Sequence, residues 1–124
     1  MTQRFAIVAS MHLTLHHHRQ FSILAAEGEL GEGNVDGVVD MLSRVPLDQA
    51  LIVDLLAVTS IDGSAAAALR SEFRDRVVQA SVTVAVADLD VTMQLVLRDV
   101  DRCSQFVRTR SDAIALTTGV LAGR

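Results

Sequence analysis

The chain has 124 residues, a length that suits one domain built around a single hydrophobic core. Half of its residues (50%) are hydrophobic, and its only aromatic side chains are four Phe, so we expect a mainly aliphatic core. The net charge of -4 and the scarcity of aromatic rings argue against direct binding of DNA or RNA. Phosphate backbones attract basic surfaces, and single-stranded bases stack on aromatic rings.

No apolar run in the sequence approaches the roughly 20 residues of a membrane span, and the N-terminal apolar stretch is too short for a signal peptide. Cys103 is the single cysteine and therefore cannot form an internal disulfide, which fits a reducing compartment. We therefore expect a cytoplasmic protein that does not insert into a membrane.

The first part of the chain is typical of strands. Residues 5–9 and 12–15 both look extended, and either could be the first strand of a hairpin whose second strand covers residues 21–27. His16, His17 and His18 stand before that second strand, and we interpret them as a solvated turn. A metal site is the alternative, but no cysteine and no nearby histidine–carboxylate spacing completes a ligand shell.

The rest of the chain alternates between helices and strands. Residues 28–34 carry three glycines and predict a loop. After it, Asn34 can cap a helix that ends before Pro46. The elements that follow are a buried strand at 50–54, an alanine-rich helix from Ser64, a strand at 81–87, a helix capped by Asp90, a short strand at 106–109 and a last helix capped by Ser111.

The order β-β-α-β-α-β-α-β-α predicts an α/β fold with a mixed, mostly parallel sheet of about five strands and about four helices. No linker or internal repeat divides the sequence, so we treat residues 1–124 as a single domain. Partners and ligands in such folds meet the carboxyl ends of the strands. That rule places the loop at 28–34 and the turn Asp62-Gly63-Ser64 at the same edge of the sheet.

Ser64 lies at the start of the alanine-rich helix and has two interpretations. Ser is among the best helix N-caps, although Asp62 could serve equally. Ser64 could instead be a phosphoacceptor. A phosphate would add about -1.5 to -2 charges where the helix dipole tolerates them, but a partner packed on this turn would be repelled.

Catalysis finds little support in the sequence. The residues around Ser64 lack the Gly-x-Ser-x-Gly pattern of a nucleophile elbow. There is no GxGxxG motif and no phosphate-binding loop ending in Gly-Lys-Ser or Gly-Lys-Thr. We therefore expect a protein that is not an enzyme and that uses no cofactor and no metal.

The segment from Asp54 to Ala65 resembles the signature of STAS domains, the family of bacterial anti-sigma factor antagonists. In that signature a strand ending Asp-Leu leads to a hydrophobic-x-x-hydrophobic-Asp-Ser/Thr-Ser/Thr-Gly turn and a helix. Residues 21–30 are similar to the family's second strand and following loop, and residues 113–120 to its last helix. The resemblance covers about residues 11–121. Three positions depart from the pattern: Gly31 replaces the usual Asp, Gly63 the first Ser/Thr and Ala65 the Gly.

The resemblance implies a non-catalytic role in partner switching, a form of transcription regulation. The unphosphorylated antagonist binds an anti-sigma factor of the serine-kinase type and frees a sigma factor, and phosphorylation of the signature serine releases it. Ser64 matches that phosphoacceptor, and Asp62 matches the acid before it. The expected partner-binding residues are Gly28, Glu29, Leu30, Gly31, Asp62, Gly63, Ser64 and Ala65.

Two other functions remain open. The chain could be a STAS accessory subunit bound to the ATPase of a bacterial lipid-import ABC transporter, a role that the same resemblance allows. A small hydrolase that uses Ser64 as its nucleophile is the third possibility. The sequence leaves the oligomeric state open.

Overall fold

The computed structural model describes residues 3–8, 11–78, 82–88, 90–92 and 105–122. Its strands are β1 (Gln3–Val8), β2 (Met11–His17), β3 (Phe21–Leu30), β4 (Ala50–Ile61), β5 (Thr83–Val86) and β6 (Gln105–Val107). Its helices are α1 (Val35–Ser43), α2 (Gly63–Val78) and α4 (Arg110–Ala122). Residues 90–92 are helical too, and the rest of the helix predicted there lies outside the described residues.

The six strands form one sheet in the order β1-β2-β3-β4-β5-β6. The pairs β1–β2 and β2–β3 are antiparallel, whereas β3–β4, β4–β5 and β5–β6 are parallel. The predicted mixed, mostly parallel sheet is therefore confirmed. The sequence left open whether residues 5–9 or 12–15 form the first strand, and the structure has a strand at each, β1 and β2. Strand β1 is therefore an additional edge strand beside the predicted hairpin of β2 and β3.

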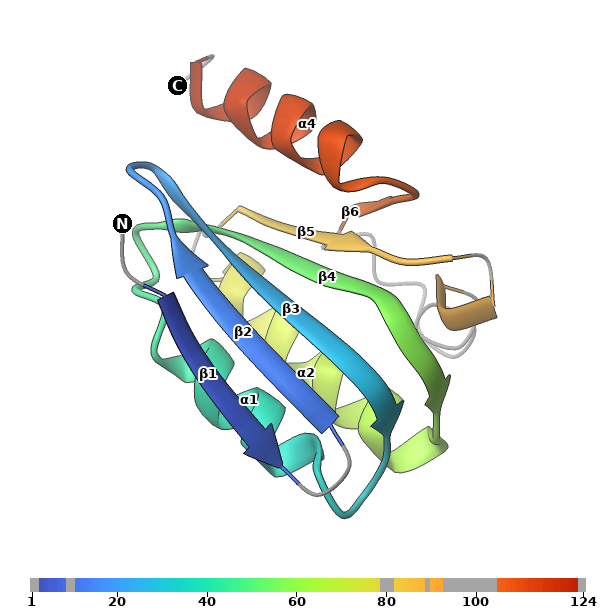
Figure 1. Cartoon of the computed structure of the whole chain (residues 1–124). Coiled ribbons are helices and arrows are strands. Elements are labelled where there is room, and N and C mark those ends of the chain that lie inside the picture. The colour runs from blue at the N-terminus through green and yellow to red at the C-terminus, as the bar shows by residue number, and fades with distance from the viewer. Residues whose placement is uncertain (1–2, 9–10, 79–81, 89, 93–104, 123–124) are drawn as a thin grey trace.

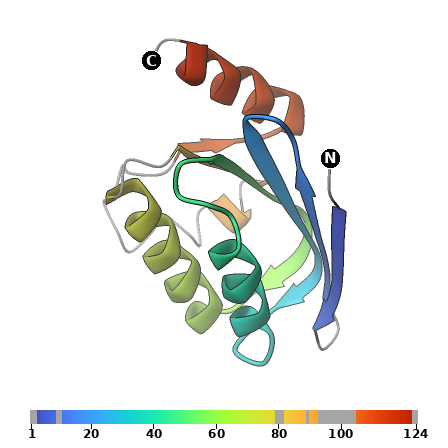
Figure 2. The ribbon, with the colours of Figure 1, turned by 90° about the vertical axis from the view of Figure 1, so that its left-hand side faces the viewer.

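The helices cover the two faces of the sheet unequally. Helices α1 and α2 lie side by side on one face, and α4 lies against the opposite face near β4, β5 and β6 (Figures 1 and 2). Strand β2 shows how the sequence defines these faces, because Met11, Leu13 and Leu15 are buried in the larger core while His12 is exposed. This alternation follows from the two-residue period of side chains along a strand.

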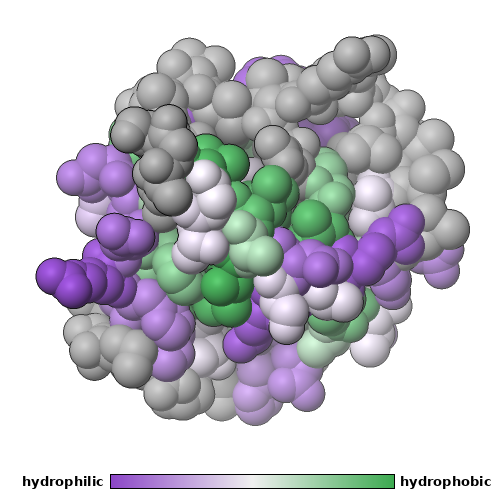
Figure 3. Space-filling model, turned by 90° about the horizontal axis from the view of Figure 1, so that it is seen from above, coloured by the Kyte–Doolittle hydropathy of each residue, from purple (hydrophilic) through white to green (hydrophobic). Residues whose placement is uncertain are grey.

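Helix α4 packs on a second, smaller core that contains Ile52, Val84 and Ala113. Its first residue, Arg110, also binds the nearly buried Asp54 of β4, because Nε and Nη2 lie 2.9 and 2.8 Å from Asp54 Oδ2. Seen from above, where α4 lies, hydrophobic residues gather in the middle of the surface with hydrophilic residues around them (Figure 3). Among the described residues, no helix has the length and apolar character needed to cross a membrane.

Helix α2 buries the face that the sequence predicts. Ala65, Leu69 and Phe73 are at most 2% exposed and belong to the larger core. Val77 was expected on the same face, and its side chain lies outside the described residues. The spacing of four residues per contact is typical of one face of an α-helix.

Arg76 on α2 is also buried, at 2% exposure, which the sequence did not indicate. Its Nη1 donates to the carbonyl oxygen of Val45 at 3.1 Å, and its Nη2 donates to the carbonyl oxygens of Pro46 and Gln49 at 3.4 and 3.2 Å. Burial lowers the pKa of the guanidinium, and the negative charge of Glu72 opposes that shift. Arg76 thereby ties the segment after α1 to α2.

Two of the predicted helix caps are wrong, each by two residues. Asp88 Oδ1 and Thr109 Oγ1 each accept the backbone N–H three residues later, at 2.9 and 3.0 Å. Asp88 and Thr109 therefore cap the helices at 90–92 and 110–122, in place of Asp90 and Ser111. Asp, Ser and Thr are all good N-caps, so residue type alone could not identify which of the neighbouring candidates caps each helix.

The predicted turn at the three adjacent histidines is wrong for His16 and His17, because β2 extends through His17, whereas His18 lies after the strand. The rings of His16 and His18 lie 4.5 Å apart, whereas His17 Nδ1 lies 2.7 Å from the hydroxyl of the buried Ser22. Burial and the neighbouring His16 lower the pKa of His18. Among the described residues, no cluster of His, Cys, Asp and Glu could hold a metal ion.

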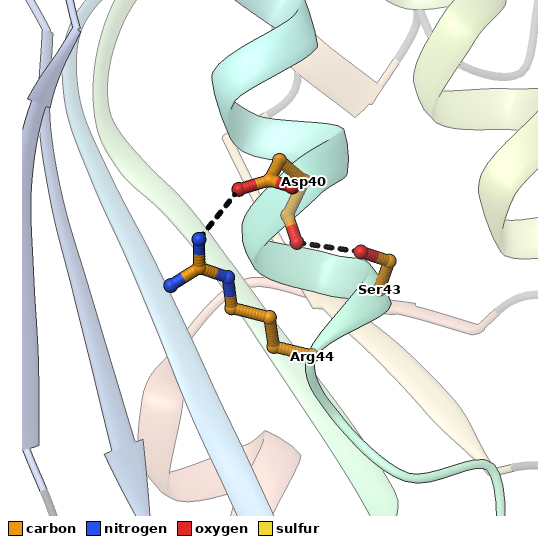
Figure 4. A network of polar contacts seen from close by, with 3 residues as sticks. All are labelled: Asp40, Ser43 and Arg44. Carbon is orange, nitrogen blue, oxygen red and sulfur yellow. Dashed lines mark hydrogen bonds and ion pairs between the residues drawn. The ribbon is translucent and has the colours of Figure 1, made fainter.

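Helix α1 carries an exposed ion pair that we expect to contribute little to stability. Arg44 Nη2 lies 2.9 Å from Asp40 Oδ2, and Ser43 Oγ donates to the Asp40 carbonyl oxygen (Figure 4). The two charged side chains are 49% and 62% exposed, so water screens their attraction. Asp40→Asn should therefore change the free energy of unfolding by less than about 0.5 kcal/mol in urea denaturation, as should Asp36→Asn. A loss above about 1 kcal/mol for Asp40→Asn alone would contradict this expectation.

Candidate functional site

The parallel pairing of β3 with β4 brings the two predicted site segments together. The register runs from Phe21 opposite Ala50 to Leu30 opposite Ile61, so both strands end at the same edge of the sheet. The backbone N–H of Asp62 donates to the Leu30 carbonyl oxygen at 3.1 Å. The loop after β3 and the turn before α2 are therefore neighbours, as the rule for parallel strands predicted.

The loop after β3 is shorter than predicted, because residues 28–30 belong to the strand. Gly28, Glu29 and Leu30 pair with β4 up to Ile61, with a register shift between Gly28 and Glu29. Gly28 has a φ of 119°, a conformation that favours glycine. Gly28 thus allows the irregular backbone at this register shift inside β3. The sequence pattern had suggested that the strand ended there.

Asn34 closes this loop. The prediction that its side chain caps α1 is wrong, because that side chain makes no capping hydrogen bond. The residue does occupy the N-cap position before Val35. Its Oδ1 accepts the Gly31 N–H at 2.8 Å, however, and its Nδ2 donates to the Glu29 carbonyl oxygen at 2.6 Å. Since Asn34 is only 6% exposed, these bonds satisfy a buried amide and fix the path of the loop.

The carboxylate of Asp62 connects the two segments. Its Oδ1 accepts the backbone N–H of Ala65 at 2.8 Å, which makes Asp62 the N-cap of α2 and decides between the two cap candidates, Asp62 and Ser64. Its Oδ2 accepts the backbone N–H of Glu32, in the loop after β3, at 3.0 Å. The bond from Ala65, and after it the bond from Glu32, lowers the pKa of Asp62 because both stabilise the carboxylate form.

The remaining predicted residues differ in their exposure. Gly63 and Ser64 are exposed in the first turn of α2, so the Ser64 hydroxyl is accessible from solvent. Ala65 is fully buried and Leu30 is 2% exposed, which places both side chains in the core. Gly63 and Ser64 therefore belong to the surface, while Ala65 and Leu30 support it from beneath.

A pocket of about 390 Å³ lies between the two segments. Its lining contains four of the predicted site residues, Glu29, Leu30, Gly31 and Asp62, and four that were not predicted as site residues, Gly33, Asn34, Ser60 and Ile61. Ser60 and Ile61 were missed because β4 was expected to end at residue 54, whereas it reaches residue 61. The apolar residues after position 54 were the signal that could have extended it.

Comparison with known proteins shows a likeness of structure without a likeness of sequence. No protein-family model matches the chain, and no curated protein matches it either. A solved structure of the anti-sigma factor antagonist SpoIIAA in its unphosphorylated form matches over 95% of this chain and 99% of its own, with a TM-score of 0.64 and 15% sequence identity. The chain has a SpoIIAA-like fold. The resemblance to anti-sigma factor antagonists is thus confirmed at the level of the fold.

Two further structures share this fold in part or in full. An uncharacterised protein of the DUF3478 family from Shewanella loihica, described as having a SpoIIAA-like fold, matches over 86% of this chain and 92% of its own. The TM-score is 0.56 and the identity 10%. A structure of Mglu matches over 57% of this chain at a TM-score of 0.55 and 15% identity, but this corresponds to only 18% of Mglu.

Proposed function

We propose that the chain is an anti-sigma factor antagonist that binds an anti-sigma factor of the serine-kinase type in partner switching. The observation that carries this proposal is the SpoIIAA-like fold over 95% of the chain, combined with an exposed serine in the first turn of α2. The binding surface comprises the loop after β3, the pocket between the two segments and the start of α2. The chain itself performs no catalysis and acts in the cytoplasm.

The position of Ser64 suits a switch controlled by phosphorylation. The kinase partner would transfer the γ-phosphoryl group of ATP to Ser64 Oγ, breaking the bond to ADP, forming the new P–O bond and releasing the hydroxyl proton. Within the domain, the positive end of the α2 helix dipole would accommodate the phosphate. The partner would meet about two added negative charges beside Asp62 and would dissociate.

The proposal predicts that the kinase partner modifies Ser64 and no other residue. Incubation of the parent chain with the partner and ATP should add the mass of one phosphate group, and Ser64→Ala should stay unmodified. Intact-mass spectrometry measures both. Ser60→Ala is the matched control, because Ser60 is exposed at the same edge of the sheet, and it should be modified like the parent.

Three results would contradict the proposal. Equal phosphorylation of Ser64→Ala and the parent would exclude Ser64 as the acceptor. Co-purification of the tagged chain with an ABC-transporter ATPase, in place of a kinase-type anti-sigma factor, would overturn the proposed partner. Labelling of Ser64 by a fluorophosphonate would instead support a hydrolase.

A further inference from the structure

The two segments that form the proposed binding surface lie 30 positions apart in the sequence, and one side chain joins them. Asp62 Oδ1 holds the first turn of α2 through the Ala65 N–H at 2.8 Å, while Oδ2 holds the loop after β3 through the Glu32 N–H at 3.0 Å. Each oxygen of the carboxylate therefore serves a different segment. We call this arrangement the Asp62 bridge.

Gly31 lies directly against the Asp62 bridge. A Cβ atom at position 31 would stand 2.9 Å from Asp62 Oδ2 and 3.6 Å from Asp62 Cγ, and the first distance is closer than real Cβ atoms approach. The carboxylate could not move away without lengthening a hydrogen bond to Glu32 or to Ala65. By contrast, a Cβ at Gly33 or Gly63 would meet no atom within 4 Å.

We infer that Asp62 is a positioning residue of the proposed partner surface, and that Gly31 is the residue whose missing side chain lets the Asp62 bridge close. This inference rests on the proposed function, because it assigns the bridge a role in binding the partner. Asp62 holds the loop after β3 and the start of α2 in one arrangement before the partner arrives. The partner then meets a preorganised surface and does not have to order the loop during binding.

The bridge and the helix cap can be separated by one substitution. Asn caps helices about as well as Asp, so Asp62→Asn should keep the bond from the Ala65 N–H through Oδ1. The amide nitrogen that replaces Oδ2 is a donor and cannot accept the Glu32 N–H. Gly31→Ala should break the same bond by steric contact, and it leaves the Asp62 carboxylate chemically intact.

The first measurement is made on the free protein, where no partner is needed. NMR should show the Glu32 amide shifted upfield and exchanging with solvent about 10-fold faster in Asp62→Asn and in Gly31→Ala. The Ala65 amide should stay protected in Asp62→Asn. Gly33→Ala is the matched control, because it adds the same methyl group in the same loop, and it should leave the Glu32 amide as in the parent. If Gly31→Ala fails to fold, as judged by circular dichroism, Asp62→Asn carries the test.

The second measurement is the affinity for the kinase-type anti-sigma factor. Asp62→Asn and Gly31→Ala should each weaken binding about 5- to 10-fold, because the partner must then order the loop, and Gly33→Ala should bind within about twofold of the parent. An unchanged Glu32 amide in both variants would overturn the bridge, whatever the partner does. A changed amide with unchanged affinity would overturn the positioning role and leave the proposed function standing. If the parent itself does not bind, the proposed function and the positioning role both fail, while the bridge is still measured in the free protein.

Discussion

Replacing Arg76 with Met is expected to lower the free energy of unfolding by about 2–3 kcal/mol. The guanidinium is buried and donates to three carbonyl oxygens in the segment after α1. The carbonyl oxygen of Pro46 keeps a second donor, the Gln49 N–H at 3.0 Å, so it stays hydrogen-bonded in the variant. Met retains the apolar stem of the side chain but supplies no donor. Equilibrium denaturation in urea, followed by circular dichroism, measures the change.

Arg74→Met is the matched control, because Arg74 is exposed on the same helix and its replacement should cost less than about 0.5 kcal/mol. Arg76→Lys should fall between Arg76→Met and the parent, since an ammonium group cannot span three carbonyl oxygens as a planar guanidinium does. An unchanged urea midpoint for Arg76→Met would contradict this expectation. It would mean that the free energy gained by no longer burying a cation equals the free energy lost with the hydrogen bonds.

The position of Arg76 also connects stability with the candidate site. Helix α1 begins at the loop after β3, and α2 begins at the turn that holds Asp62 and Ser64. The Asp62 bridge joins the two helices at that end, and Arg76 joins them at the other. We therefore expect Arg76→Met to loosen the packing of α1 on α2, while the Asp62 bridge stays closed until the whole domain unfolds.

Two periodicities in the sequence, the alternation of side chains along strands and the four-residue spacing along helices, predicted most of the fold. The alternation in β2 and the four-residue spacing of Ala65, Leu69 and Phe73 identified core faces that the structure confirms. The buried Arg76 escaped prediction, because arginine is almost always exposed and its acceptors are backbone groups about 30 positions away. Sequence patterns indicate local structure such as helices and strands. The contact of Arg76 with the Val45 carbonyl oxygen depends instead on how α2 packs against the end of α1.

The same distinction applies to the candidate site. Its location followed from the order of strands and helices, since parallel neighbours end at one edge. Its internal contacts did not, because the bond between Asp62 and the Glu32 N–H requires the register of β3 on β4. Gly31 was noted as a departure from the STAS pattern and as an expected partner-binding residue. The structure adds a physical reason for the glycine, which is the close approach of Asp62 Oδ2.

Replacing Ser64 with Glu is expected to weaken binding of the proposed kinase-type partner by about 10- to 100-fold. Ser64 is exposed in the first turn of α2, next to the Asp62 carboxylate, so a second negative charge would lie at the centre of the proposed surface. Isothermal titration calorimetry with the purified partner measures the loss. The free energy of unfolding should not fall, because a carboxylate near a helix N-terminus is favourable by about 0.3–1 kcal/mol and offsets repulsion from Asp62.

Two control variants separate the charge from its position and its size. Ser71→Glu adds the same charge at an exposed position two turns further along α2 and should bind within about twofold of the parent. Ser64→Gln adds nearly the same volume without a charge, so its affinity should lie well above that of Ser64→Glu. Equal weakening by Gln and Glu would show that the surface excludes bulk at position 64, and phosphorylation would then act by size. Unchanged affinity for Ser64→Glu would mean that the partner binds elsewhere, because a desolvated contact at this turn cannot accept an added charge without loss.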